Sequence, residues 1–232
     1  FPLKGVFHMA FDGITIAAMV KELNTSLKGG RINKIAQPES DELLITVRGQ
    51  DGQKRLLLSA SPSLPLLYFT SKNRISPLTA PNFCMLLRKH IGSARITDIT
   101  QPGMERVVQF HLEHLNELGD VCHKILIMEL MGKHSNLIFC DDKGMILDSI
   151  KHVSSNMSSV REVLPGREYF IPKTQDKLDP LTITEEEFIS DICPKPLPAA
   201  KAIYSSLTGI SPVMAQEVCF RASIDGNDSM QS

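Results

Sequence analysis

The chain has 232 residues, of which 42% are hydrophobic and 22% are charged. This composition excludes a disordered chain, and the length fits one large domain, or one domain with a small helical appendage. The formal net charge of −1 excludes a uniformly basic nucleic-acid-binding protein, although it is compatible with a local basic patch.

The cysteines and the amino-terminal end indicate a reduced, cytoplasmic protein. Five cysteines without a CxxC pair predict buried thiols rather than a disulfide framework or a metal site. No apolar run is long enough to span a membrane, so we expect no membrane association. Residues 1–8 lack the pattern of a signal peptide, and we interpret them as an expression-tag remnant before a native start at Met9.

The first predicted element is a helix. Apolar residues recur at helical spacing from Ile16 to Leu27, and Gly29-Gly30 end the run. Asp12 precedes this helix, at a position where a carboxylate can cap free backbone amides. The helix is therefore expected to begin directly after Asp12.

Short strands with one further helix follow. The helix begins at Asn82 and ends before Gly92, and the residues 49–52 predict a hairpin between the second and third strands. The pattern predicts an α+β fold, with an antiparallel β-sandwich-like domain and flanking helices. The predicted strands are Arg31–Ala36, Leu43–Val47 with alternating polar residues, Arg55–Ala60, Leu66–Thr70, Ala94–Gln101, Arg106–His114, Val121–Met131, Asn136–Asp141 and Met145–Ser149.

The pattern becomes helical after Pro172. Asp176–Pro180 resembles a linker, and Thr184 with Glu187 forms a capping box for a short helix. We therefore expect a first domain over residues 9–174 and a small helical domain over residues 175–232.

A helix-hairpin-helix is predicted at Ser206–Arg221. Gly209 provides the tight turn, Ser211 caps the second helix and Pro212 occupies its first position. Such a hairpin can present backbone amides to a nucleic-acid phosphate, or it can simply pack against its neighbours. The acidic flank at residues 185–191 favours the second interpretation.

Two further regions could contact RNA. Residues 71–106 contain six basic and two acidic residues, a local net charge of +4 that suits a phosphate-binding surface or a solvated helix face. Met131–Asn136 is a polar segment between two apolar strands, and it is either a phosphate and ribose contact or a hairpin turn that satisfies its own backbone.

Enzyme motifs are weak. The sequence contains no P-loop, no GxGxxG and no HxxxH, and none of the seven histidines stands at a recognisable spacing from a cysteine or carboxylate. With no Trp and three Tyr, an aromatic platform for stacking bases is poorly supported. We expect no catalytic residue, no metal and no cofactor.

Several short strings occur in a specific order along the chain. They are Met9–Gly13, Gly30–Ile32, Leu56–Ala60, Pro81–Lys89, Gln101–Arg106, Glu129–Asn136, Ile150–Val153 and Leu164–Tyr169. Their order resembles the amino-terminal domain of the NFACT family over about residues 9–172, and the helical end resembles the start of that family's helix-hairpin-helix domain.

The resemblance implies a non-enzymatic role in ribosome quality control. Family members bind tRNA, rRNA and the large ribosomal subunit that still carries peptidyl-tRNA. They promote template-free addition of residues, alanine in bacteria, to the stalled chain, which marks it for degradation. Peptide transfer itself is performed by the ribosome.

The resemblance also implies a tRNA-binding site. An acidic residue of the family corresponds to Asp12, and its Asp-Arg pair corresponds to Glu105-Arg106, where Glu replaces Asp and lengthens the side chain by one methylene. Arg106 is expected to contact a tRNA phosphate or base edge, with Asp12 and Glu105 orienting it. Supporting RNA contacts are expected from Arg88, Lys89, Lys133, His134 and Asn136.

Two other functions are considered. One name within the family describes a fibronectin-binding protein, so a fibronectin- or fibrinogen-binding adhesin is an alternative. The fold also resembles the amino-terminal domain of formamidopyrimidine-DNA glycosylases, whose nucleophile is an amino-terminal proline. Met9 is followed here by Ala10 and Phe11, so the glycosylase reaction is not carried over.

Overall fold

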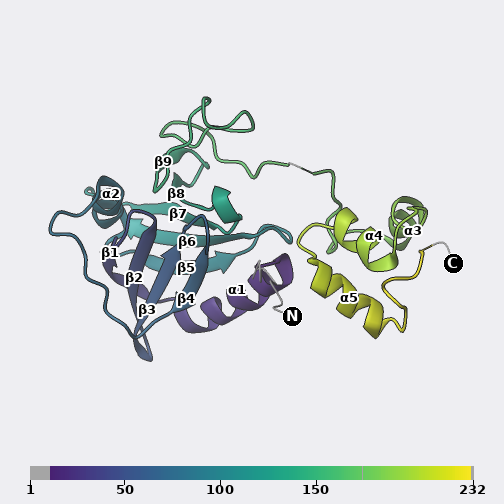
Figure 1. Ribbon diagram of the computed structural model, residues 1–232. Coiled ribbons are helices and arrows are strands. Elements are labelled where there is room, and N and C mark those ends of the chain that lie inside the picture. Colours follow the sequence, from purple (N-terminus) through teal and green to yellow (C-terminus); the bar gives the residue numbers. More distant parts are fainter. Residues whose placement is uncertain (1–10, 174, 231–232) are drawn as a thin grey trace, which may run out of the picture. The chain divides into compact units, whose positions relative to one another are not determined.

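The computed structural model describes residues 11–173 and 175–230, and within them the fold is α+β (Figure 1). The expected tag remnant over residues 1–8 and the expected start at Met9 lie outside the described residues. The helices are α1 (Gly13–Leu27), α2 (Asn82–Ile91), the 3-10 helix η1 (Gly132–His134), α3 (Glu185–Asp191), α4 (Ala199–Ser206) and α5 (Pro212–Arg221). The strands are β1 (Arg31–Ala36), β2 (Glu42–Gly49), β3 (Gly52–Ser59), β4 (Leu66–Phe69), β5 (Arg95–Thr100), β6 (Val107–Leu115), β7 (Val121–Glu129), β8 (Asn136–Asp141) and β9 (Ile146–Ser149).

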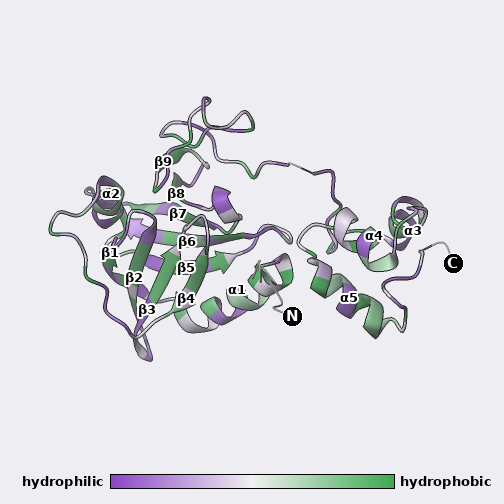
Figure 2. Cartoon of the chain, viewed as in Figure 1, coloured by the Kyte–Doolittle hydropathy of each residue, from purple (hydrophilic) through white to green (hydrophobic). Residues whose placement is uncertain are grey.

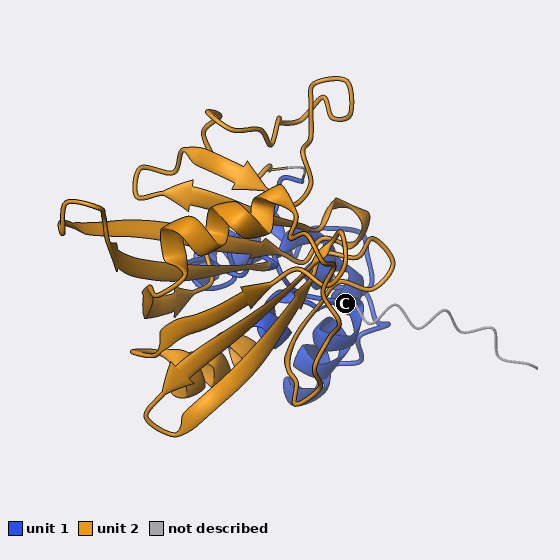
Figure 3. Ribbon diagram, turned by 90° about the vertical axis from the view of Figure 1, so that its left-hand side faces the viewer, with its two compact units in different colours: residues 1–17, 103–106, 175–232 blue, residues 18–102, 107–174 orange. Residues whose placement is uncertain are grey.

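The described strands form one antiparallel sheet in the order β4-β3-β2-β1-β5-β6-β7-β8-β9. Its halves, β1–β4 and β5–β9, join where Arg31 pairs with Arg95, and each joining strand has a register shift nearby. The halves then diverge into two layers (Figure 3). Apolar side chains of both halves, among them Ile45, Leu56 and Phe110, line one small enclosed space between the layers. The predicted sandwich-like α+β fold is confirmed.

Helices α1 and α2 cover the sheet at different places. Leu27 of α1 lines the enclosed apolar space, and the Asn24 amide exchanges hydrogen bonds with the Ile99 backbone at 2.6 and 3.0 Å. From α2, the Arg88 Nε donates to the Ile35 carbonyl of β1 at 2.8 Å. Figure 2 shows that hydrophobic residues recur along the strands of the sheet. In β2, Leu44 and Thr46 on one face and Ile45 on the other are all buried. The predicted alternation of that strand was wrong for this reason.

A buried polar network holds the segment that follows β9. Glu129 is fully buried at the end of β7 and accepts hydrogen bonds from Arg161 at 2.5 Å and from the Tyr169 hydroxyl at 2.9 Å. The Arg161 guanidinium also lies 5.6 Å from the centre of the Tyr169 ring. Burial, the Glu129 charge and the hydrogen bond to Glu129 raise the pKa of Tyr169. These hydrogen bonds take the place of the water that the buried Glu129 carboxylate would otherwise bind, and they fix a segment that has little regular structure.

The chain divides into two compact units (Figure 3). Unit 1 comprises the described parts of residues 1–17, 103–106 and 175–232, and unit 2 comprises residues 18–102 and 107–174. In unit 1, α3, α4 and α5 share a core that includes Ile192, Ile203 and Ala215. The predicted linker at residues 176–180 is packed, because the Leu178 backbone donates to the carbonyl of Ser206 at the end of α4 and accepts from the amide of Thr208.

Candidate nucleic-acid interface

Asp12 stands directly before α1 and caps it, as predicted. One carboxylate oxygen accepts hydrogen bonds from the Thr15 backbone amide and from the Thr15 hydroxyl, both at 2.8 Å. The side chain is buried, with 7% of its surface exposed. A buried carboxylate at a helix amino terminus is stabilised by these donors and by the helix dipole.

The second carboxylate oxygen of Asp12 links α1 to α5. It accepts a hydrogen bond from the Ser211 hydroxyl at 2.6 Å, although the two residues are 199 positions apart. The Ser211 oxygen in turn accepts from the Met214 amide at 3.2 Å and caps α5. One carboxylate therefore connects the amino termini of two helices.

The charge of Asp12 is maintained by these contacts. Burial opposes ionisation, but the hydrogen bonds from Ser211 and Thr15 together outweigh it and hold the pKa of Asp12 below its usual value. Asp12 is thus a carboxylate in this fold, and its oxygens are directed to Thr15 and Ser211.

Two glycines bring a third segment against this pair of caps. The Gly13 amide donates to the Gly209 carbonyl at 2.8 Å. A Cβ atom on Gly13 or on Gly209 would collide with the carbonyl oxygen of Met104. Gly209 also has a φ of 74°, which favours glycine. We call residues 12–13, 103–106 and 208–211 the junction.

Glu105 and Arg106 follow Met104 in the junction and are half-buried. They lie near Lys177. Burial lowers the pKa of Lys177, Arg106 lowers it further and Glu105 raises it. The Lys177 ammonium donates to the Tyr204 carbonyl at 2.9 Å. Two cations and one carboxylate of unit 1 are therefore close enough to interact electrostatically.

The predicted trio is thus only partly linked. Asp12, Glu105 and Arg106 all belong to the junction of unit 1, but the Asp12 carboxylate is bonded to Thr15 and Ser211 rather than orienting Arg106 directly. Ser211 and Gly209 were predicted as a cap and a turn, whereas their contact with Asp12 and Gly13 was not. Neither Met104 nor Lys177 was predicted to contribute.

The expected supporting residues belong to unit 2. Lys133 and His134 are exposed on η1, and Lys89 is exposed on α2. Arg88 has its Nε bonded to Ile35 of the sheet. Asn136 is buried, and its side-chain amide bonds the Lys151 backbone and the Leu137 amide, so an RNA contact is not proposed for it.

Two features bear on other kinds of function. Within the described residues, no group of three or more His, Cys, Asp or Glu side chains is arranged to hold a metal ion. In the same part of the chain, no helix is long and apolar enough to cross a membrane.

The chain belongs to the NFACT family, because the model of the NFACT N-terminal and middle domains matches residues 12–232. Among curated relatives, it is 39% identical over 217 residues to "Rqc2 homolog RqcH" of Bacillus subtilis, covering 93% of this chain and 38% of the relative. It is 27% identical over 151 residues to "Ribosome quality control complex subunit NEMF" of Homo sapiens, covering 65% of this chain and 13% of the relative. The chain thus spans less than two fifths of these relatives.

Solved structures show the same fold. The amino-terminal domain of fibronectin-binding protein PavA from Streptococcus pneumoniae has a TM-score of 0.82 at 36% identity, covering 92% of this chain and 80% of that one. The amino-terminal part of the fibronectin/fibrinogen-binding protein from Streptococcus suis has a TM-score of 0.83 at 33% identity, covering 95% and 83%.

Proposed function

We propose that this chain is the tRNA- and large-subunit-binding module of a cytoplasmic ribosome quality control factor. The factor promotes template-free alanine tailing of stalled nascent chains and so marks them for degradation. Its partners are tRNA, alanine tRNA in particular, and the rRNA of a large subunit that carries peptidyl-tRNA. The family membership and the names of the curated relatives support the process. The observation that supports an RNA-binding site is the junction, where charged side chains are held on a fixed backbone.

The junction provides a positive charge on a fixed backbone. Arg106 and Lys177 lie near each other with Glu105 as a nearby carboxylate. A guanidinium suits a bidentate contact with a phosphate or with a base edge, and Glu105 restricts its orientation. Lys177 increases the local potential for an RNA backbone.

Asp12 acts on Arg106 through the backbone. Its bonds to Thr15 and Ser211 hold α1 and α5 together, and Gly13 and Gly209 then fit against Met104, two residues before Arg106. Asp12 is therefore a positioning residue in this proposal. The chain supplies binding and positioning, and peptide transfer belongs to the ribosome.

The test is Arg106→Ala in the full-length protein, followed by tRNA capture on large subunits and by tailing. A lost phosphate or base-edge contact costs about 1–3 kcal/mol, so we expect tRNA capture to weaken roughly 5- to 150-fold and tailing to fail. The salt dependence of binding should fall by about one phosphate contact. Glu105→Asp, which restores the family's residue, should retain tailing.

The matched control is Arg167→Ala. Arg167 is an exposed arginine of unit 2 that pairs with Glu162 at 2.8 Å, so its removal tests loss of charge without loss of the junction. We expect wild-type tailing from this variant. Wild-type tailing from Arg106→Ala, with the junction intact by hydrogen exchange, would show that the site assignment is incorrect.

Fibronectin or fibrinogen binding is the second candidate function, because two of the similar structures carry that name. It is tested by measuring binding of the chain to immobilised fibronectin alongside Arg106→Ala. Tight, salt-resistant binding that the variant retains, without capture of tRNA, would favour this candidate over the first.

A further inference from the structure

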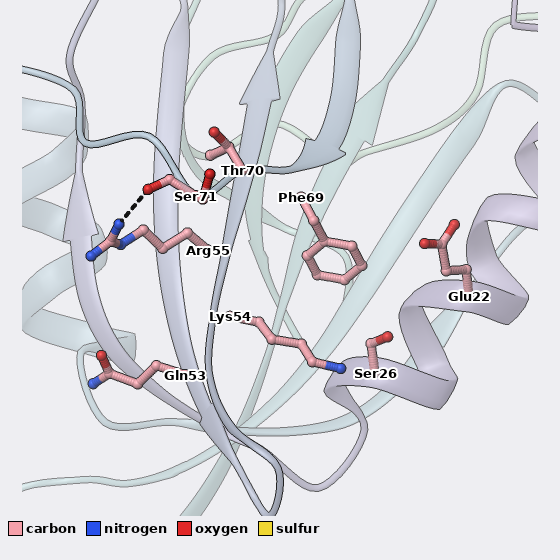
Figure 4. Close-up of a pocket in the computed structure, with 8 residues that line it drawn as sticks. All are labelled: Glu22, Ser26, Gln53, Lys54, Arg55, Phe69, Thr70 and Ser71. Carbon is pink, nitrogen blue, oxygen red and sulfur yellow. Dashed lines mark hydrogen bonds between the residues drawn. The ribbon is translucent and has the colours of Figure 1, made fainter.

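A groove separates α1 from the β3–β4 edge of unit 2 (Figure 4). Its volume is about 620 Å³. All its residues lie between positions 18 and 102, within unit 2, and none of them is a junction residue. The lining residues are Glu22, Ser26, Gln53, Lys54, Arg55, Phe69, Thr70 and Ser71.

The groove combines an aromatic face with cationic and hydroxyl groups. The Phe69 ring stands between the strands and α1, and the Lys54 side chain extends from β3 toward Ser26 (Figure 4). Arg55 donates to the Ser71 carbonyl at 2.9 Å, which holds one N–H of a guanidinium that has five. Glu22 supplies a carboxylate from the opposite wall.

A smaller apolar hollow of about 290 Å³ adjoins this groove and shares Glu22 and Phe69 with it. Met19, Leu23 and Leu67 contribute to its lining. The groove therefore has a cationic end, an aromatic centre and an apolar end. An organic ring with an attached anion matches this order of groups.

Charge selects between the two ligands that fit an aromatic groove at a sheet edge, an extended peptide and an unpaired nucleotide. Lys54 and Arg55 outnumber Glu22, and Lys72 is exposed just beyond Ser71. This surplus favours a polyanion. A base inside the groove must be out of its stack, which is how proteins recognise single-stranded RNA.

We propose that this groove binds an unpaired nucleotide of RNA. The base stacks on Phe69, its phosphate pairs with Lys54, and Glu22 accepts a hydrogen bond from an exocyclic amine or a 2′-hydroxyl. The inference rests on the proposed function only for the source of the RNA. The groove would be a second RNA contact in addition to the junction.

The test uses the 232-residue chain, a short single-stranded RNA of mixed sequence, and the same sequence as a duplex. We expect Phe69→Leu, which keeps an apolar side chain but removes the stacking face, to weaken single-strand binding about tenfold without changing its salt dependence. Lys54→Gln should weaken binding and reduce the slope of log affinity against log salt by about 0.7. Lys143→Gln, in the exposed β8–β9 turn, is the matched control and should bind as wild type.

Ultraviolet crosslinking locates the contact and keeps the test valid if one variant folds poorly. Crosslinks from the wild-type chain should map to Phe69–Ser71. Absence of crosslinks at Phe69–Ser71, equal binding by all three variants, or duplex binding as tight as single-strand binding would overturn the proposal. Binding of an acidic peptide in place of RNA would also overturn it.

The groove proposal and the junction proposal can be rejected independently of each other. Arg106→Ala should leave crosslinks at Phe69 intact, because the groove does not contain Arg106. If Arg106→Ala abolishes tailing but the 232-residue chain does not bind single-stranded RNA in the groove, the proposed function stands and the groove proposal is rejected.

Discussion

The sheet of unit 2 and the junction of unit 1 are each stabilised internally, but by opposite kinds of contact. Most neighbouring strands of the sheet are also consecutive in sequence, so every described ladder except that between β1 and β5 joins two successive strands around an apolar core. The junction joins three segments from distant parts of the chain through a carboxylate, a hydroxyl and two glycines. A sheet of this kind tolerates local error, whereas the junction depends on a few atoms in fixed positions.

The largest expected effect is that of Gly209→Ala. The substitution imposes a side chain at positive φ and against the Met104 carbonyl, so we expect a loss of about 2–4 kcal/mol of stability in unit 1. Hydrogen exchange at the first amides of α5 measures it. Gly144→Ala, at a φ of 82° in the β8–β9 turn with open space around it, should cost only about 1–2 kcal/mol. Equal losses at both glycines would contradict the close packing of the junction.

A smaller effect is expected from Ser211→Ala. Removal of the cap and of the bond to Asp12 should cost about 1–2 kcal/mol, measured by urea unfolding. A double-mutant cycle with Asp12→Asn should give a coupling of at least about 0.5 kcal/mol. Thr184→Ala removes a cap whose capping-box partner is the local residue Glu187, and it should not couple to Asp12→Asn. Additive losses for Asp12→Asn and Ser211→Ala would show that the bond between these two side chains does not stabilise the junction.

The smallest effect concerns pH. Because the folded-state pKa of Asp12 lies below its usual value of 3.8, its contribution to stability is fully present above that value and is lost as the pH falls through the folded-state pKa. Asp12→Asn should therefore flatten the acid limb of a stability-against-pH curve for unit 1. The curve at neutral pH should keep its shape. An unchanged acid limb would argue that the carboxylate is no better stabilised in the fold than in the unfolded chain.

The same contrast explains what the sequence could predict. Strands such as Arg31–Ala36 and Asn136–Asp141 were predicted with the bounds that the structure has, because turn residues and apolar runs are local features. The Thr184 capping box and the Ser211 cap were also predicted, since each needs only three or four neighbouring residues. Local patterns therefore predicted the helices and strands and the fold class, but they did not predict the pairing of β1 with β5.

The candidate site could be predicted only in part. Asp12, Glu105 and Arg106 came from a family resemblance, and no spacing in the sequence shows that Ser211 bonds Asp12 or that Lys177 lies near Arg106. Asn136 illustrates the difficulty, because a polar residue between strands can be exposed or, as here, buried with its amide bonded to the backbone. Long-range polar contacts of this kind leave no periodic pattern.

The bond between Asp12 and Ser211 also has a consequence for synthesis. A ribosome that adds 5–20 residues per second needs roughly 10–40 s to proceed from Asp12 to Ser211. During that interval Thr15 is the cap partner that Asp12 already has, and α1 can form before α5 exists. Unit 1 contains the first helical residues of the described part of the chain, but its junction stays incomplete in the nascent protein until α5 has emerged.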